Sequence, residues 1–271
     1  MTLVLAVAAG AFIGLSLGAL GGGGSILAVP VLVYLLGQSA TQATTGSLVV
    51  VAVTSAIAAV AAGREGHVLL GRGVAFGVVA LGGAAVGAKA SAHVSSEVLM
   101  AAFALLMLGV GASMVVRLLR HRRTGGRSDR VDDDPIITFT PRFACQCPRA
   151  LKVLVTATAV GLLTGFLGVG GGFLVVPALL LALGLPMEMA AGTSLVVITI
   201  TSLGALAVRA GVGVHPDWTP VAILTATSAV AAVVGARLAG RVDTRRLQAA
   251  FTFLVLGVAA YTAAQALPAL V

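Results

Sequence analysis

Two glycine-rich runs give this sequence its clearest means of binding a ligand through the backbone. Residues 21–24 are four consecutive glycines followed by Ser25, and residues 168–172 read Gly-Val-Gly-Gly-Gly. Glycine costs a helix about 1 kcal/mol per residue relative to alanine, so each run predicts a break between two helical segments. Helices that begin at Ser25 and Gly172 would direct unpaired N–H groups and positive dipole ends at the break, which favours an anion. The alternative is that these glycines only permit tight turns and close packing.

Hydroxyl side chains follow each glycine run. Thr45 and Ser47 lie near the start of one apolar segment, and Thr193 and Ser194 lie near the start of another. Hydroxyl donors can replace water around an oxyanion without a fixed counter-charge. The alternative is that these hydroxyls cap a helix or bond to the preceding turn.

A basic pair, Lys89 and Arg237, is the secondary candidate for ligand binding. Charged residues within membrane spans suggest function, but both lie near helix ends, where long basic side chains reach the headgroups. No Asp or Glu falls in the middle of an apolar segment, so a carboxylate proton relay is not expected. Cys145 and Cys147 have no nearby pair of histidines, and their spacing is poor for zinc. The sequence therefore predicts no catalytic residue, no metal, no cofactor and no enzymatic activity.

Composition places the chain in a membrane. Of its 271 residues, 59% are hydrophobic and only 10% are charged, whereas a soluble domain has roughly a quarter of its residues charged. A helix crosses the ~30 Å hydrocarbon core with about 20 apolar residues, and several such segments are present. The net charge of +8 does not indicate a nucleic-acid partner, because nine of the seventeen Lys and Arg residues lie between Arg117 and Lys152. Such a basic stretch is typical of a cytoplasmic loop.

The chain is an internal duplication. Residues 14–30 (GLSLGALGGGGSILAVP) match residues 161–177 (GLLTGFLGVGGGFLVVP) at an offset of 147 residues (161 − 14), and the match continues beyond this block. After one inserted residue it resumes at an offset of 148 (237 − 89). A long internal repeat predicts two halves of similar structure. We expect each half to contain a glycine-broken hairpin followed by three helices.

The expected elements divide the chain into two repeats and a linker. The first repeat, 1–118, has its hairpin at about 3–37 and helices at about 41–62, 70–92 and 97–118. The second, 151–271, has its hairpin at about 152–184 and helices at about 188–209, 219–239 and 246–267. Charge places the basic linker, 119–150, in the cytoplasm and both termini outside the cytoplasmic membrane. The halves then have opposite orientations, the inverted-repeat plan of many secondary transporters, in an all-α polytopic fold.

The paired glycine blocks, Gly21 to Pro30 and Gly168 to Pro177, are each followed by Ala-x-x-x-Ser-Leu and resemble those of the TauE/SafE sulfite exporter family. The resemblance covers nearly the whole chain except the linker. It implies export of sulfite or a small organosulfonate such as sulfoacetate. The family's glycine element falls on Gly21, Gly23, Gly24, Gly168, Gly170, Gly171 and Gly172, and its hydroxyl element on Thr45, Ser47, Thr193 and Ser194. The first half has Thr45-Gly46 where the second has Gly192-Thr193, so the hydroxyls of the two halves need not be equivalent.

These residues together with Ser25 form the predicted substrate site, and the predicted ligand is a small inorganic or organic anion. We expect a secondary transporter that exports a sulfur-containing anion across the cytoplasmic membrane. The alternatives are an anion-conducting channel that uses the same site and a transporter of another small organic anion. A membrane enzyme would need a catalytic constellation that the apolar segments lack. The lipid bilayer is the expected surrounding, nucleic acid is not an expected partner, and a homodimer is left open.

Overall fold

The structure, a computed structural model, is all-helical over the residues that it describes. These are 2–91, 105–106, 108–112, 115–116, 147–167, 172–209, 217–239, 242–243, 246–247 and 249–257. The helices of the first half are α1 (Thr2–Leu20), α2 (Ser25–Pro30), the π-helical turn η1 (Val31–Leu35), α3 (Ala40–Arg64) and α4 (Leu70–Ser91). Those of the second half are α6 (Cys147–Leu167), α7 (Gly172–Ala182), α8 (Met187–Arg209) and α9 (Trp218–Ala239). The expected all-α fold class is confirmed for this part of the chain.

Four of these helices are long and apolar enough to cross a membrane. The spans are Gln42–Arg64, Leu70–Gly87, Met187–Val208 and Trp218–Ala239. Two further apolar stretches, Val4–Leu20 in α1 and Val153–Gly165 in α6, are shorter. Large apolar side chains such as Val4 and Val230, each 71% exposed, point outward. Because such surfaces need an apolar surrounding, the helices fit a protein embedded in lipid.

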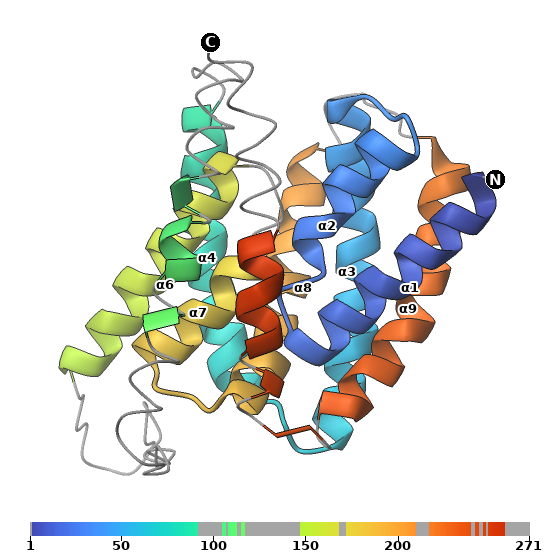
Figure 1. Cartoon of the computed structure of the whole chain (residues 1–271). Coiled ribbons are helices and arrows are strands. Elements are labelled where there is room, and N and C mark those ends of the chain that lie inside the picture. The colour runs from blue at the N-terminus through green and yellow to red at the C-terminus, as the bar shows by residue number, and fades with distance from the viewer. Residues whose placement is uncertain are drawn as a thin grey trace.

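Two central helices are flanked by two helix pairs. Figure 1 shows α3 and α8 in the middle of the molecule, with α1 and α9 on one side and α4 and α6 on the other. Helix α3 also packs on α9, and α4 packs on α8. The short helices α2 and α7 approach the centre beside α3 and α8 respectively. The starts of α2 and α7 therefore lie inside the bundle.

The flanking pairs pack so closely that glycine is required at the contact. A β-carbon on Gly14 of α1 would meet the carbonyl oxygen of Ser228 in α9, and one on Gly161 of α6 would meet that of Ala80 in α4. The side chain of Ser228 also donates a hydrogen bond to the Gly10 carbonyl oxygen, at 2.9 Å. Small residues permit this backbone approach, and packing of this kind drives helix association in lipid.

The second arm of each hairpin carries a proline, and the two arms respond differently. Pro30 cannot donate a backbone hydrogen bond, and the chain continues from it as a π-helical turn, in which Leu36 N–H donates to the Val31 carbonyl oxygen at 3.1 Å. The second arm of the first hairpin is thus an α-helix followed by a wider turn. Helix α7 contains Pro177 and remains α-helical to Ala182.

Other boundaries agree with local sequence signals, with one difference. Helix α3 begins after Ser39, whose side chain forms a capping box with Gln42. Helix α6 begins at Cys147, inside the range expected for the linker, so the expected start at about 152 was too late. Most of the linker, with Cys145, and parts of the expected helices 97–118 and 246–267 lie outside the described residues. The division into two repeats and a linker stays a prediction.

Candidate functional site

The starts of the short helices α2 and α7 meet inside the bundle. A β-carbon built on Gly172, the first residue of α7, would lie 2.5 Å from Ser25 Oγ at the start of α2. It would also lie 2.9 Å from Ile198 Cδ1 on α8. Ser25 is 1% exposed. The starts of α2 and α7 are therefore in contact with each other and with a central helix, which is the juxtaposition that the glycine runs predict.

The first hairpin tip also rests on α8. Gly21 has φ +75°, a backbone conformation that favours glycine. A β-carbon there would meet Ser194 Oγ and the backbone of Ala191. Gly24 lies against the Ile13 carbonyl oxygen, and Gly23 lies against Leu254. The glycines of this tip thus allow close approach, and a side chain at Gly21 would push the tip away from α8.

The predicted serine hydroxyls donate their protons to nearby carbonyl groups. Ser25 Oγ donates to the Gly22 carbonyl oxygen at 2.7 Å. Ser47 Oγ donates to Thr44 at 2.9 Å, and Ser194 Oγ donates to Ala191 at 2.7 Å. Each hydroxyl has a single proton. Each must therefore rotate away from its carbonyl before it can donate to an anion.

The predicted threonines are buried, and one of them holds a loop. Thr193 Oγ1 accepts a hydrogen bond from the Leu69 N–H at 3.1 Å, in the connection between α3 and α4. The neighbouring Gly192 lies against the His67 carbonyl oxygen. Thr193 is 0% exposed, and Thr45 is buried on α3. In this conformation the Thr193 oxygen binds the loop, and its predicted contact with substrate stays a prediction.

The remaining predicted residues do not join the hairpin contact in the described part of the chain. Arg237 lies in the last turn of α9 with its side chain exposed. Lys89 lies near the end of α4, and its side chain is outside the described part. Gly168, Gly170 and Gly171 are also outside the described residues.

A group of hydroxyls that the sequence analysis missed lies in the middle of α3 and α8. Ser55 Oγ and Thr199 Oγ1 are 2.9 Å apart across the two helices. Thr54 Oγ1 and Ser202 Oγ are buried, and neither has a hydrogen-bond partner among the residues that the structure describes. The sequence contains a pattern that could have indicated these residues: Thr54-Ser55 recurs as Thr201-Ser202 at the same offset of 147 (202 − 55) as the glycine blocks.

Comparison with known proteins identifies the family. A family model described as sulfite exporter TauE/SafE matches residues 6–262. The chain belongs to the TauE/SafE sulfite exporter family. Two relatives from Xylella fastidiosa, strains Temecula1 and 9a5c, are 35% and 34% identical over 198 and 202 residues, which cover 73% of this chain and 70% of each relative. Both are called "Probable membrane transporter protein". No solved structure matches the chain significantly.

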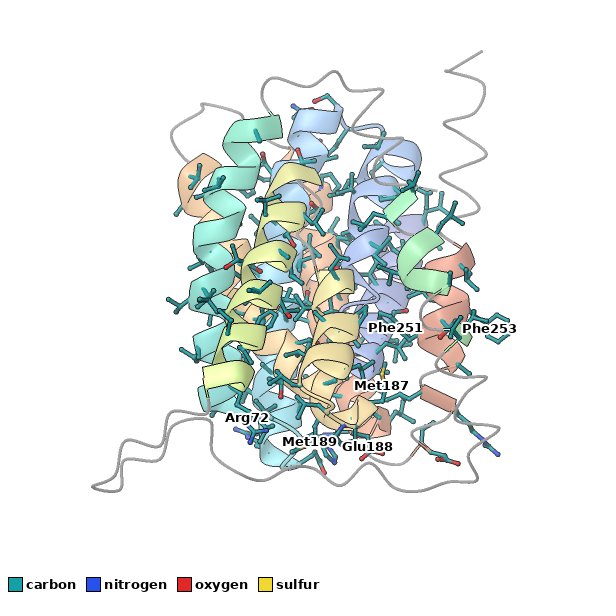
Figure 2. All side chains as sticks on the ribbon, turned by 90° about the vertical axis from the view of Figure 1, so that its left-hand side faces the viewer. Arg72, Met187, Glu188, Met189, Phe251 and Phe253 are labelled. Atoms are coloured by element: carbon teal, nitrogen blue, oxygen red, sulfur yellow. The ribbon has the colours of Figure 1, made fainter. Side chains whose placement is uncertain are left out.

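The site of this TauE/SafE family member has no formal charge in its central elements. The sequence contains no Asp, Glu, Lys or Arg in residues 1–63, 153–187 or 189–208, which cover the first hairpin, the second hairpin from Val153 onward and nearly all of α3 and α8. Every buried polar side chain in the described residues is a serine, threonine or glutamine. Arg72 and Glu188 lie at one end of the bundle (Figure 2). These central segments therefore offer an ion dipoles and hydroxyls but no formal charge.

Metal ligands do not gather in the described residues. No group of three or more His, Cys, Asp or Glu side chains there is arranged to hold a metal ion. The apolar helices, together with membership of a family of membrane transporters, support a protein that crosses the membrane several times.

Proposed function

We propose that this protein is a secondary transporter that exports a small sulfur-containing anion, sulfite or an organosulfonate such as sulfoacetate, across the cytoplasmic membrane. The family supports the substrate class, since its model describes a sulfite exporter. The observation that carries the proposal is the contact between Ser25 and Gly172, where two helix starts meet inside the bundle. Broken helices whose starts point at an anionic group are the usual arrangement at a transporter's substrate site.

The two halves are proposed to be inverted repeats. Supporting this, α1 packs on α9 as α6 packs on α4, and these pairs correspond under the repeat offsets. The correspondence extends to single residues: Gly14 meets the Ser228 carbonyl, and its equivalent Gly161 meets that of Ala80, the equivalent of Ser228. A pseudo-two-fold axis lying in the membrane plane would relate the halves. An experimental structure whose halves superpose about an axis along the membrane normal would contradict this arrangement.

Topology follows from the positive-inside rule. The basic linker 119–150 is proposed to lie in the cytoplasm, with both chain termini outside. The first hairpin then enters the membrane from outside and the second from the cytoplasm. Cysteine placed at Ser128, in a variant that lacks the native cysteines, should resist an impermeant reagent in intact cells and react after permeabilisation. Ready labelling in intact cells would contradict this topology.

Electrostatics explains how such a site can bind an anion and release it. An anion that enters the bilayer loses its hydration, and an unpaired ion there is very costly. The start of α7 supplies N–H donors and partial positive charge. At the start of α2, the Ser25 and Leu27 N–H groups already donate to the Gly22 and Gly24 carbonyl oxygens, at 3.3 and 3.2 Å. Ser25 and Ser194 can add donors once their hydroxyls turn from the carbonyls that they now contact. Because no full positive charge is fixed among these elements, the anion is not held too tightly for release.

Two hydrogen bonds between the halves mark where the bundle would open during transport. Thr193 Oγ1 accepts a hydrogen bond from the Leu69 N–H, and Gln38 Nε2 donates one to the Asp217 carbonyl oxygen at 3.1 Å. The first bond joins α8 in the second half to the α3–α4 connection in the first half. The second joins the residues before α3 in the first half to the residue before α9 in the second half. We place them at opposite membrane faces, so breaking one while keeping the other would give the site access to one side at a time.

A binding and flux assay tests the proposal. Purified protein is screened by thermal shift against sulfite, sulfate, thiosulfate, sulfoacetate, taurine and chloride, and then reconstituted into liposomes. We expect saturable flux of a sulfur-containing anion that the same anion on the opposite side stimulates, as in a carrier. Single-channel currents would favour an anion channel instead. Flux of another organic anion with none of the sulfur compounds would overturn the substrate.

A further inference from the structure

We propose that Thr54, Ser55, Thr199 and Ser202 form a second part of the substrate site, which binds oxygen atoms of the transported anion beside the hairpin tips. We name these four residues the mid-helix hydroxyl cluster. They are distinct from the predicted site residues, and they come only from the central helices α3 and α8. The inference rests on the proposed function for the identity of the ligand, an oxyanion with several oxygen atoms.

Two members of the cluster, Ser55 and Ser202, continue the faces of α3 and α8 that approach the hairpin tips. On α8, Ser194 contacts Gly21, and Ile198 contacts Gly172. Residues four apart share one face of a helix, so Ser202 is the next position along this face after Ile198. Ser202, whose hydroxyl has no hydrogen-bond partner in the described residues, therefore lies one helical turn from the contact between Ile198 and Gly172.

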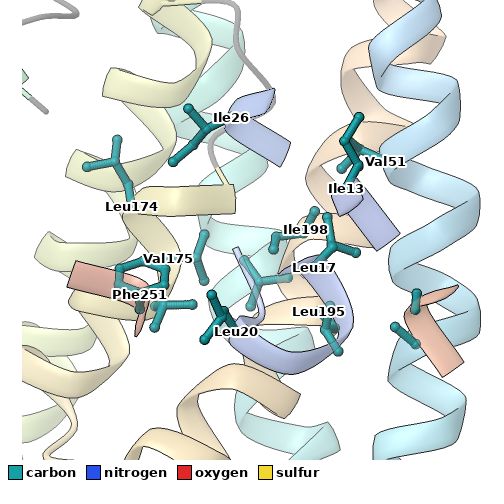
Figure 3. Packing of buried hydrophobic residues seen from close by; sticks show 14 of the residues in the cluster. Ile13, Leu17, Leu20, Ile26, Val51, Leu174, Val175, Leu195, Ile198 and Phe251 are labelled. Carbon is teal, nitrogen blue, oxygen red and sulfur yellow. The ribbon is translucent and has the colours of Figure 1, made fainter. Parts of the chain in front are cut away.

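Helix α3 repeats the same series. Ser47, Val51 and Ser55 are the equivalents of Ser194, Ile198 and Ser202 at the offset of 147 (198 − 51). Val51 and Ile198 belong to one buried cluster with Leu17 (Figure 3). Each central helix thus presents a serine, an aliphatic residue and a second serine along the face that borders the tips. The second serine of each series belongs to the hydroxyl cluster.

Hydrogen bonding separates the cluster into a paired and an unpaired part. Ser55 Oγ is 3.2 Å from the Ala52 carbonyl oxygen as well as 2.9 Å from Thr199 Oγ1. Thr199 Oγ1 donates to the Leu195 carbonyl oxygen at 2.7 Å. Thr54 and Ser202, both 0% exposed, have no partner in the described part of the chain. Two donors are therefore available without breaking a bond.

The unpaired hydroxyls are unusual because helical serines and threonines normally bond to the preceding turn. Thr201, adjacent to Ser202, does so with the Val197 carbonyl oxygen at 3.0 Å. Thr225 on α9 does so with Val221 at 2.7 Å. A buried hydroxyl without a partner costs free energy. A ligand that accepts the hydrogen bond recovers that cost, and such a ligand explains why Thr54 and Ser202 are polar.

Charge decides between an anion and a cation. A hydroxyl can donate to an anion or accept a cation. The positive dipole end of α7 starts at Gly172, which contacts Ile198 one turn from Ser202. No carboxylate occurs in either hairpin, and the only acidic residue of α8 is Glu188 in its first turn. These surroundings favour an anion over a cation.

Substitutions separate a ligand-binding hydroxyl from a structural one. Ser202→Ala and Thr54→Val remove the two unpaired hydroxyls, and Thr54→Ser keeps the hydroxyl at that position. Thr201→Val is the matched control, since it removes a neighbouring hydroxyl that bonds within its own helix. We expect Ser202→Ala and Thr54→Val to weaken sulfite binding about ten- to hundred-fold, the loss of one hydrogen bond to a charged group. Thr54→Ser and Thr201→Val should bind sulfite about as the unmodified protein does.

Thermal unfolding without ligand supplies a second readout. Loss of an unpaired buried hydroxyl should leave the unfolding temperature unchanged or raise it, while the shift produced by sulfite falls. If Ser202→Ala and Thr54→Val instead lower the unfolding temperature and keep the half-saturation of sulfite flux in liposomes, the hydroxyls are structural and the inference is wrong, although the proposed function stands. If the unmodified protein moves no sulfur-containing anion, the proposed function fails, and the inference fails with it. Stabilisation by Na⁺ that Ser202→Ala removes would show a cation site and would also overturn the inference.

Discussion

Ser25 and Gly172 occupy equivalent positions of the two repeats (172 − 25 = 147), and they contact each other. A β-carbon on Gly172 would lie 2.5 Å from Ser25 Oγ. Equivalent residues can touch only where both halves contribute equally, so the contact lies on the line that would relate the halves. The contact leaves room for the side chain of only one of these two residues. Serine on one side therefore requires glycine on the other, and the site is chemically asymmetric at its centre.

This complementarity predicts a rescue by double substitution. Gly172→Ala should reduce sulfite flux strongly, because its β-carbon overlaps Ser25 Oγ and forces the tips apart. Adding Ser25→Ala removes the overlapping oxygen and should restore part of the flux. Gly82→Ala on α4 is the control, since nothing lies within 4 Å of a β-carbon there. Because Ser25 is also a proposed donor to the anion, thermal unfolding tests the overlap itself: an equal loss of unfolding temperature in the single and double variants would show that the overlap is not the cause.

Close packing of the flanking helices predicts an effect on stability. A β-carbon on Gly165 of α6 would meet the Ala84 carbonyl oxygen of α4. Gly165→Ala should therefore destabilise the protein by about 1–3 kcal/mol, as overpacking does. Gly63→Ala, at an open position near the end of α3, should not destabilise it. Thermal unfolding in detergent compares the two, and equal unfolding temperatures would contradict the tight α4–α6 contact.

The sequence predicted helix positions well because the membrane restricts the choices. Long apolar segments bounded by glycine or charge must be helical in lipid, and α3, expected at 41–62, is observed at Ala40–Arg64. The π-helical turn after Pro30 was not predicted, because Pro177 in the same sequence context leaves α7 regular. The difference between the two arms therefore depends on parts of the chain outside these local sequences.

The candidate site was predictable only where the backbone determines it. Glycine runs predicted that chain breaks would come together, and Ser25 does meet Gly172. Hydroxyls were harder to interpret, because a serine in an apolar segment usually bonds to its own helix. Ser194 does this, whereas Ser202 does not. Only the tertiary structure distinguishes the two.

Thr193 can act on the loop or on the substrate, and one substitution separates these roles. Thr193→Val leaves the Leu69 N–H without its acceptor, which costs about 1–3 kcal/mol if the group stays buried. We expect faster amide hydrogen exchange in the connection between α3 and α4. Thr225→Val, which removes a hydroxyl bonded within α9, should not change exchange there. Unchanged exchange combined with weaker sulfite binding would instead assign Thr193 to direct substrate contact.

A site without formal charge should prefer anions with one negative charge over anions with two. The cost of moving an ion out of water rises with the square of its charge, whereas its attraction to helix dipoles and hydroxyl donors rises only in proportion to the charge. The first hairpin, the second hairpin from Val153 onward and α3 up to Arg64 lack charged residues, so no cation in these segments offsets the second charge. Methanesulfonate should therefore compete with sulfite flux at a concentration about ten-fold lower than sulfate requires, a difference of about 1.4 kcal/mol. Among organosulfonates, those with one charge should compete better than sulfoacetate, which has two. Competition by sulfate and sulfoacetate as strong as that of methanesulfonate would show that a basic residue reaches the anion, and Lys89→Gln and Arg237→Gln would then identify it by removing the tolerance for the second charge.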